Sequence, residues 1–521
     1  ENVNIPSSVK IIMSYAFPKG IKEVILPEGV ERLESCDFGG CENITSIKLP
    51  STIKFIGSRC FSEVPITSLE LPNGIEELEN ACFYGSKIEE LYIPQSVKKI
   101  GNINCIWRDE DGCDRYTLKK VTFACDLPKE VTRNYIILES SANYCFDFDE
   151  EWYKEYTYAS DIHNSKQRIE IVFEDTVKTI EADEIDPENF HCVFKGAFNS
   201  IDFGNGVEKI GNGAFDVNVA NLVLPSSLKS MDDNNFFGQI KKLTIQSDFD
   251  NSFFEKWRGE VGGEIKYVSP FYWGYEVDPD TGLYVTEMNE WGFLDTIEAP
   301  IELINFTENV TSIPPRLFES SWIDTVTASN LESIGEYAFF DSKINTISFP
   351  HLKLIGKNAF QYCQIDTSFA VTADEIDVYA FYGAKLPADA DLSKTNKFGF
   401  RSFTETIFEG EVVINANAEF LSVDEWGDER FLKDTFWKSK MPSLVVNCNL
   451  FLEPDIFREI TTNSLIFGSE VTCIGESSFT NSSINGIVDL TNVTYIGKWA
   501  FDGADVEKFV FGSKPTTVKY R

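Results

Sequence analysis

Histidine is the side chain that most often supplies general acid–base catalysis or a zinc ligand, and the chain contains only His163, His191 and His351. His191 precedes Cys192 in an irregular segment, and His351 follows Pro350 at a turn, so we expect structural or surface roles for both. The sequence contains no H-E-x-x-H, G-x-S-x-G, phosphate-binding glycine loop or dinucleotide motif. These observations predict no catalytic residue and no enzymatic activity.

Two acidic loops place several oxygen donors close together, as calcium sites require: Asp109–Asp114 and Asp278–Gly282. Neither loop continues to the distal bidentate glutamate of a complete calcium loop. The chain has 83 acidic residues, so neighbouring carboxylates also arise by chance. We interpret both loops as solvated turns, and we predict no metal ion and no cofactor.

The 12 cysteines lack the C-x-x-C spacing of zinc and redox motifs. Cys60 and Cys82 each stand directly before a phenylalanine, where other copies of the same pattern have alanine, and this favours buried thiols. Cys105 and Cys113 are close enough in sequence to form a disulfide, but sequence alone does not decide it. The cysteines therefore leave the redox compartment open.

A dense aromatic cluster, Tyr267, Tyr272, Trp273 and Tyr275, surrounds Pro270. Tyrosine and tryptophan are enriched in the cores of protein interfaces, so these four aromatic residues are a candidate binding patch. The alternative, which we favour for the irregular stretch around them, is an elongated repeat that carries a longer helix or loop on its convex side.

The elements that must position these residues come from an internal repeat. Prolines recur about every 22 residues in the first part of the chain, at Pro27, Pro50, Pro72 and Pro94. Later in the chain a phenylalanine recurs about every 21 or 22 residues, at Phe318, Phe339, Phe360, Phe381 and Phe403. Such a period is typical of a solenoid, in which each turn buries its apolar face against its neighbours.

Each repeat has three parts with separate physical roles. Leu69–Pro72 alternates apolar and polar residues and predicts a short strand that proline ends, because proline cannot donate a further ladder hydrogen bond. Val471–Gly475 closes with glycine, which we expect to turn the chain through backbone angles that a side chain forbids. Ala338 and Phe339 place a small residue beside a large ring, and stacked copies of the ring predict an internal aromatic ladder.

Leu69–Pro72, Val471–Gly475 and Tyr337–Phe339 resemble the repeat of the BspA-type leucine-rich repeat proteins, L-x-x-I-x-L-P-x-x-V-x-x-I-G-x-x-A-F-x-x-C, and Cys41 and Cys363 stand at the family's cysteine position. The resemblance covers about 60% of the chain in recognisable units. It implies an α/β repeat solenoid, a right-handed superhelix with short parallel strands on the concave face and about 21–23 residues per repeat. It also implies a cell-surface adhesin.

We expect one solenoid over residues 1–521, with regular and irregular parts. Regular repeats are expected at about 1–103, 170–247, 299–408 and 464–521. Irregular or elongated units are expected at about 104–169, 248–298 and 409–463.

The charge balance restricts the partners. With 46 basic and 83 acidic residues, the net charge of −37 opposes binding to nucleic acid or to an anionic membrane. The sequence contains no run of about 18 apolar residues, so it predicts no membrane insertion. Glu1–Asn4 lacks the features of a signal peptide, so for a secreted or cell-surface protein we expect a leader to have been removed.

Taken together, these features predict a binding module that attaches to a protein or glycan ligand on a host or microbial surface. One alternative is a structural spacer that displays other domains. Another is a polysaccharide-acting enzyme whose site lies around Tyr267–Tyr275, which would require two suitably separated carboxylates. The sequence leaves the oligomeric state open.

Overall fold

The computed structural model describes residues 2–103, 105–108, 113–127, 130–131, 137–139, 144–145, 169–181, 193–211, 214–231, 240–248, 258–261, 264–267, 275–277, 284–286, 300–421, 433–450, 455–513 and 517–518. The chain divides into two compact units: unit 1, residues 1–244 with 290–298, and unit 2, residues 245–289 with 299–521. Each unit is described by itself below.

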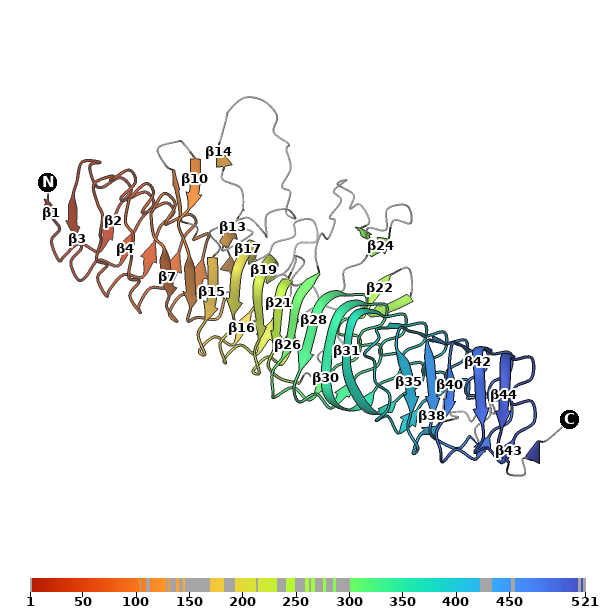
Figure 1. Cartoon of the computed structure of the whole chain (residues 1–521). Coiled ribbons are helices and arrows are strands. Elements are labelled where there is room, and N and C mark those ends of the chain that lie inside the picture. Colours follow the sequence, from red (N-terminus) through yellow and green to blue (C-terminus); the bar gives the residue numbers. More distant parts are fainter. Residues whose placement is uncertain are drawn as a thin grey trace. The chain divides into compact units, whose positions relative to one another are not determined.

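Unit 1 consists of strands joined by turns (Figure 1). Its strands are β1 (Asn2–Asn4), β2 (Ile11–Ile12), β3 (Glu23–Ile25), β4 (Arg32–Leu33), β5 (Phe55–Ile56), β6 (Glu77–Leu78), β7 (Glu90–Ile93), β8 (Lys99–Ile100), β9 (Ile106–Arg108), β10 (Cys113–Tyr116), β11 (Lys120–Phe123), β12 (Glu130–Val131), β13 (Ile137–Glu139), β14 (Tyr144–Cys145), β15 (Ile169–Phe173), β16 (Thr179–Ile180), β17 (Phe194–Asp202), β18 (Lys209–Ile210), β19 (Phe215–Leu224), β20 (Ser230–Met231) and β21 (Ile240–Ile245).

Unit 2 continues the same architecture. Its strands are β22 (Arg258–Val261), β23 (Glu264–Tyr267), β24 (Tyr275–Val277), β25 (Tyr284–Thr286), β26 (Ile301–Phe306), β27 (Ser312–Ile313), β28 (Trp322–Ala328), β29 (Ser333–Ile334), β30 (Lys343–Ile355), β31 (Gln364–Ile376), β32 (Lys385–Leu386), β33 (Lys397–Phe398), β34 (Ile407–Phe408), β35 (Glu411–Ile414), β36 (Glu419–Phe420), β37 (Lys440–Met441), β38 (Ser443–Val446), β39 (Thr461–Thr462), β40 (Leu465–Phe467), β41 (Cys473–Ile474), β42 (Ser483–Leu490), β43 (Tyr495–Ile496), β44 (Asp505–Phe511) and β45 (Thr517–Val518).

Parallel pairing between strands one repeat apart makes each unit a solenoid. In unit 1, Leu33 of β4 pairs with Ile56 of β5, and Ile56 pairs with Leu78 of β6. In unit 2, Val326 of β28 pairs with Ile347 of β30. All five side chains are fully buried, so each apolar position becomes a column through the core. These offsets agree with the predicted 21–23 residues per repeat.

The predicted aromatic ladder is confirmed in both units. In unit 2 successive ring centroids lie 5.0–5.5 Å apart with interplanar angles of 3–24°, along Phe318, Phe339, Phe360, Phe381, Phe403, Phe436, Phe457, Phe479 and Phe501. In unit 1 the centroids lie 4.8–6.2 Å apart along Phe17, Phe38, Phe61 and Phe83. The ladder explains why a phenylalanine recurs once per repeat.

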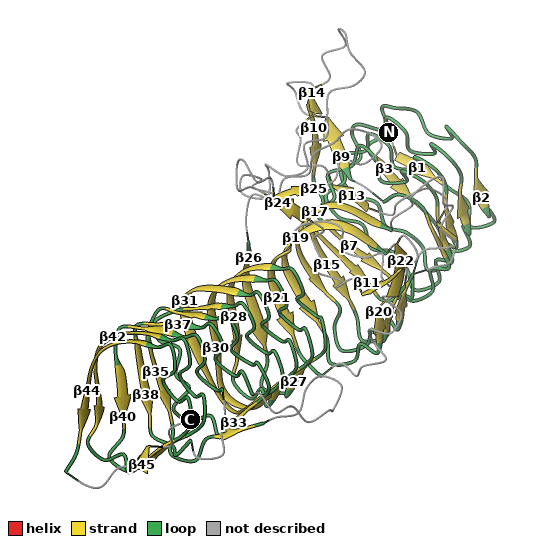
Figure 2. Cartoon of the chain, turned by 90° about the vertical axis from the view of Figure 1, so that its right-hand side faces the viewer, coloured by secondary structure: helices red, strands yellow, loops and turns green. Residues whose placement is uncertain are grey.

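The α/β class is wrong, because the described residues contain strands and loops but no helix (Figure 2). The residue two positions before the ladder phenylalanine and the residue two positions after it have a positive φ, as at Tyr337 (57°) and Asp341 (52°). An α-helix requires negative φ at every residue, so the turn between strands cannot become helical. It follows that no helix in the described ranges is able to cross a membrane.

Glycine in the V-x-x-I-G element has a different role from the expected one. Gly57 and Gly356 do not have a positive φ, and the positive-φ glycines lie elsewhere. A Cβ at Gly57 would lie 2.6 Å from the backbone carbon of Glu34, and one at Gly356 would lie 2.6 Å from the carbonyl oxygen of Ile334. Glycine is needed here because the neighbouring turn of the solenoid approaches too closely for a side chain.

Proline ends some strands but not all. β7 stops directly before Pro94, as expected. Pro350, however, lies inside β30, where the pairing with β31 shifts register between Phe349 and Leu352. The strand continues around the corner because the register shift accommodates the residue that cannot donate a ladder hydrogen bond.

Two of the expected irregular stretches contain longer turns of the solenoid. Ile407 of β34 pairs in parallel with Lys385 of the preceding turn and with Lys440 of the following turn. The interval in sequence to Lys440 is longer than the interval to Lys385, so this turn contains extra residues. In the other stretch, Val121 of β11 pairs with Ile171 of β15. The described strands of the remaining stretch form antiparallel pairs, β22 with β23 and β24 with β25.

Candidate binding surface

The turn around the ladder phenylalanine Phe381 leaves three residues partly exposed. In Tyr379–Ala384, Phe381 is fully buried, whereas Tyr379, Tyr382 and Gly383 are partly exposed. Tyr379 and Gly383 have φ of 56° and 67°. A left-handed non-glycine residue costs about 1–2 kcal/mol, so burial of the ring and the hydrogen bonds of the turn must offset that cost.

Backbone hydrogen bonds hold neighbouring turns in register. The amides of Tyr379, Phe381 and Gly383 donate to carbonyl oxygens of the next turn at 3.1, 2.7 and 2.8 Å. The next turn repeats these three bonds, with donors Arg401, Phe403 and Glu405 at 3.3, 2.8 and 2.7 Å. The exposed positions consequently form three parallel columns. We call the stacked turns of unit 2 the turn row; they begin at Arg316, Tyr337, Asn358, Tyr379, Arg401, Asp434, Asp455, Ser477 and Trp499.

Five aromatic side chains of the turn row form a continuous surface, which we call the aromatic stripe: Tyr337, Phe340, Tyr362, Tyr379 and Tyr382. Neighbouring ring centroids in it lie 5.5–5.8 Å apart. Tyr362 is 44% exposed, and the other four are half-buried. Rings that contact one another at the surface offer a large, ordered apolar area at little cost in side-chain entropy.

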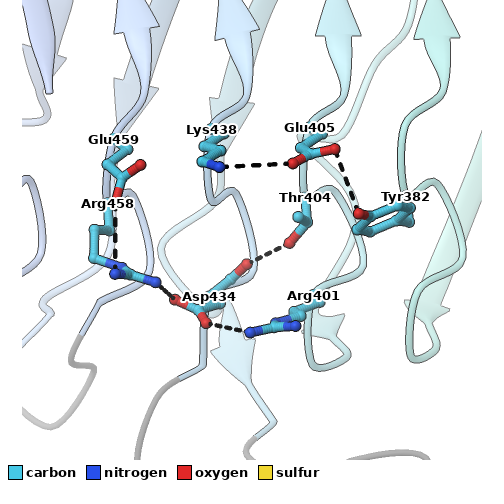
Figure 3. Close-up of polar contacts among 8 residues, drawn as sticks. All are labelled: Tyr382, Arg401, Thr404, Glu405, Asp434, Lys438, Arg458 and Glu459. Carbon is cyan, nitrogen blue, oxygen red and sulfur yellow. Dashed lines mark hydrogen bonds and ion pairs between the residues drawn. The ribbon is translucent and has the colours of Figure 1, made fainter.

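A charged group, the Asp434 cluster, adjoins the aromatic stripe (Figure 3). The carboxylate of Asp434 is only 1% exposed and accepts hydrogen bonds at 3.1 Å from Nη2 of Arg401 and from Nη2 of Arg458. Thr404 Oγ1 donates to the Asp434 carbonyl oxygen at 2.8 Å. Removing one partner of such a buried pair is strongly destabilising, so the two arginines are held in fixed positions.

Trp437 lies at the centre of the Asp434 cluster. Its ring centroid is 5.1 Å from the Arg401 guanidinium carbon, 4.9 Å from that of Arg458 and 4.5 Å from Lys438 Nζ. Tryptophan, tyrosine and arginine are the residues most enriched at binding hot spots. The Asp434 cluster supplies the tryptophan and the arginines, and the adjoining stripe supplies the tyrosines. The cluster and the stripe together have the composition of an interface core.

Burial changes the titration of several groups in the turn row. It raises the pKa of Asp341, and it raises the pKa of Asp455 to about 6, partly offset by Arg458. Burial and the adjacent Glu405 carboxylate raise the pKa of Tyr382, whose hydroxyl donates to Glu405 at 3.4 Å. The charge of the row therefore becomes less negative as the pH falls through about 6.

The candidate patch from sequence lies largely outside the described side chains. Tyr267 ends β23 and Tyr275 begins β24, and these strands are described by their backbone pairing only. Tyr272 and Trp273 lie outside the described residues. The patch stays a prediction.

The other sequence candidates are only partly covered. His351 is exposed in β30. His163, His191, Asp109–Gly112 and Asp278–Gly282 lie outside the described residues. Across the described part of the chain, no three His, Cys, Asp or Glu side chains gather as a metal site would require.

The cysteine prediction is confirmed where it is described. Cys60 and Cys82 are fully buried free thiols, and burial raises the pKa of each well above its usual value. Cys105 is also a buried free thiol, with its pKa raised to about 12 by burial. Thiols with raised pKa values are poor nucleophiles, so these cysteines are core residues.

Sequence reasoning missed the aromatic stripe, although a signal for it was present. The five aromatic residues stand two before, one after or two after a ladder phenylalanine in neighbouring repeats. Aligning the repeats on that phenylalanine places the five residues in adjacent columns, although they are spread over three repeats of the chain.

Comparison with known protein families supports the repeat assignment. A family model described as BspA type leucine rich repeat region, in six copies, matches residues 1–106, 183–257, 283–366 and 433–521, which is more than half of the chain. A crystal structure of a leucine-rich repeat protein from Bacteroides ovatus is 17% identical, with a TM-score of 0.28, over 79% of this chain and 87% of that one. No curated protein matches the chain in sequence.

Proposed function

Because the chain belongs to the BspA-type leucine-rich repeat family, we propose that it is a cell-surface or secreted binding module that adheres to a protein on a host or microbial surface. The observation that carries the proposal is the aromatic stripe. Monomeric proteins rarely expose contiguous rings without a binding role, and tyrosine, tryptophan and arginine dominate the energetics of interfaces.

Three features of unit 2 support this use of the turn row. The backbone hydrogen bonds between turns fix the row before a partner arrives, which reduces the entropy lost on binding. The Asp434 cluster holds Trp437 and two arginines in place beside the stripe. The net charge of −37 favours association with basic surfaces and suits a soluble surface protein.

The proposal assigns no catalytic step to the chain, because solenoids of this kind act as scaffolds that present extended binding surfaces. A structural spacer is the second candidate. It would place no demand on the aromatic stripe, and the same experiment separates the two.

The test is capture of host matrix and microbial surface proteins by the immobilised chain at low and at physiological salt. We expect a partner that is retained at physiological salt and is lost in the Tyr362→Ala variant. The matched control is Tyr92→Ala in unit 1, because Tyr92 is 43% exposed and Tyr362 is 44% exposed. Retention at low salt only would favour the spacer, whereas equal retention by both variants at physiological salt would place the binding surface outside the aromatic stripe.

A further inference from the structure

The turn row repeats one arrangement of three groups: a cation over an aromatic ring, with a carboxylate beside the cation. The Arg316 guanidinium carbon lies 4.1 Å from the Tyr337 ring centroid, and its Nη1 is 2.8 Å from a carboxylate oxygen of Glu319. At the Asp434 cluster, the Arg458 guanidinium carbon lies 4.9 Å from the Trp437 ring centroid. Nη1 of Arg458 lies 3.6 Å from a carboxylate oxygen of Glu459 (Figure 3). Each arrangement combines a cation–π contact with an ion pair.

The centre of the aromatic stripe has the rings of this arrangement and one carboxylate, Asp341, but lacks the cation. Within residues 300–421, 433–450 and 455–513, no lysine or arginine lies over the rings of Phe340, Tyr362 or Tyr382. Asp341 occupies the same turn position as Tyr362 one turn earlier, and in the same ranges its carboxylate has no hydrogen bond or ion pair. On the other side, Glu405 accepts a hydrogen bond from the Tyr382 hydroxyl and already has a cation, because Lys438 Nζ lies 3.9 Å from its carboxylate (Figure 3).

The nearby basic side chains already pair with other groups. Lys357 lies 3.5 Å from Glu336, and Lys385 lies 2.9 Å from Glu409. Arg401 is bound to the buried Asp434 carboxylate. A cation for the centre of the stripe must therefore come from a partner.

We infer that the aromatic stripe binds an extended protein segment that carries arginine or lysine, with a cation lying over the ring of Tyr362 beside Asp341. This rests on the proposed function and names the partner's chemistry. The rings of Phe340 and Tyr382 meet the ring of Tyr362 edge to face, with interplanar angles of 76° and 81°. The three rings therefore do not present parallel faces, and the cation is assigned to Tyr362, which is the most exposed of them. The net charge of −37 attracts such a segment from a distance.

The test uses a synthetic peptide of about ten residues that alternates arginine and serine, so that all arginines lie on one face when it is extended. The control peptide has citrulline in place of arginine, which keeps the shape and part of the N–H donors but removes the charge. Titration calorimetry with the whole chain at physiological salt measures both. We expect the citrulline peptide to bind roughly tenfold more weakly or not at all.

Variants of the chain locate the site. Tyr362→Leu removes the ring face and should weaken arginine-peptide binding by about fivefold, whereas Tyr362→Phe keeps the face and should bind like the wild type. Asp341→Asn should weaken binding by about two- to fivefold. Tyr92→Leu in unit 1 is the control for loss of an equally exposed tyrosine and should have no effect.

The outcomes separate this inference from the proposed function. Equal binding of the two peptides, or equal binding by Tyr362→Leu and wild type, would overturn the inference while a captured surface protein would still support the function. Binding of neutral oligosaccharides at the stripe, abolished by Tyr362→Leu, would replace the basic segment with a glycan. Failure to capture any surface protein would count against the function itself.

Discussion

Replacing Asp37 should stabilise unit 1 above neutral pH. Asp37 is 1% exposed, and neither carboxyl oxygen has a hydrogen-bond partner among the described residues. It directly precedes Phe38, a position that Cys60 and Cys82 fill in the next two turns. Burial raises its pKa from 3.8 to about 7; the backbone of Glu34 lowers the pKa in part, and the Glu34 carboxylate raises it. An unpaired buried carboxylate of this kind is costly when ionised.

Proton linkage gives the direction and the size of the change in stability with pH. Between pH 3.8 and about 7 the folded state holds a proton that the unfolded state has released, so stability falls as the pH rises through this window. The free energy of unfolding falls by about 1.4 kcal/mol for each pH unit in this window, and by about 4 kcal/mol over the full window. The other groups that face Asp37 are Glu34 and the Cys60 thiol, and burial keeps that thiol protonated over this range.

Hydrogen exchange measured by mass spectrometry follows the turns around Asp37 in the whole chain. We compare the wild type with Asp37→Asn, which removes the charge, and Asp37→Ala, which also removes the unpaired polar atoms. From pH 5 to 7, protection in the wild type should fall by about tenfold per pH unit relative to either variant. Parallel pH profiles for all three proteins would refute the reasoning, because they would show that Asp37 titrates normally.

Other substitutions test the core, the Asp434 cluster and the surface through urea unfolding. Phe339→Ala should destabilise unit 2 by about 3–5 kcal/mol, since the ring is fully buried in the ladder; an unchanged midpoint would contradict that role. Asp434→Ala should cost about 3–5 kcal/mol because it leaves two guanidinium groups without their buried partner, whereas a loss below about 1 kcal/mol would mean that water replaces it. Ser439→Ala should cost about 0.5–1.5 kcal/mol, the value of its hydrogen bond to a ladder carbonyl oxygen at 2.6 Å, and a larger loss would indicate a packing role. Lys353→Ala should change stability by at most about 1 kcal/mol, because its ion pair with Glu332 is exposed; a larger change would show a coupled network.

The period, the buried phenylalanine and the buried thiols were predictable because each depends on one residue type at one repeat position. The secondary structure of the segment that connects the strands was not predictable. The residue types in Tyr337–Asp341 are compatible with a helix. Only the positive φ of Tyr337 and of Asp341 excludes it. No residue type marks those positions, since tyrosine, asparagine, arginine and aspartate all occupy them. Their backbone angles result from hydrogen bonds to the next turn, which are tertiary contacts that local sequence does not encode.

The aromatic stripe was hidden for a related reason. Tyr362 and Tyr382 are one turn apart in space, with ring centroids 5.5 Å apart, yet the residues between them in sequence form a complete strand and corner. Contacts of this kind become visible only after the repeats are aligned on the buried ring. The Asp434 cluster is harder still, because the turn that supplies Asp434 follows the longer interval after Phe403, which breaks the regular spacing.

The turn row separates the residues that fold the chain from those available for binding. The ladder phenylalanine, the small residue before it and the buried residue three positions after it face the core, as Phe360, Ala359 and Cys363 do. The backbone bonds between turns involve no side chain, so the exposed positions vary without disturbing them. A row of this kind accepts Tyr362 in one turn and Gly383 in the next at the same position. The residues of the binding surface can therefore change one by one while the core stays constant. A scaffold that binds different ligands requires this separation.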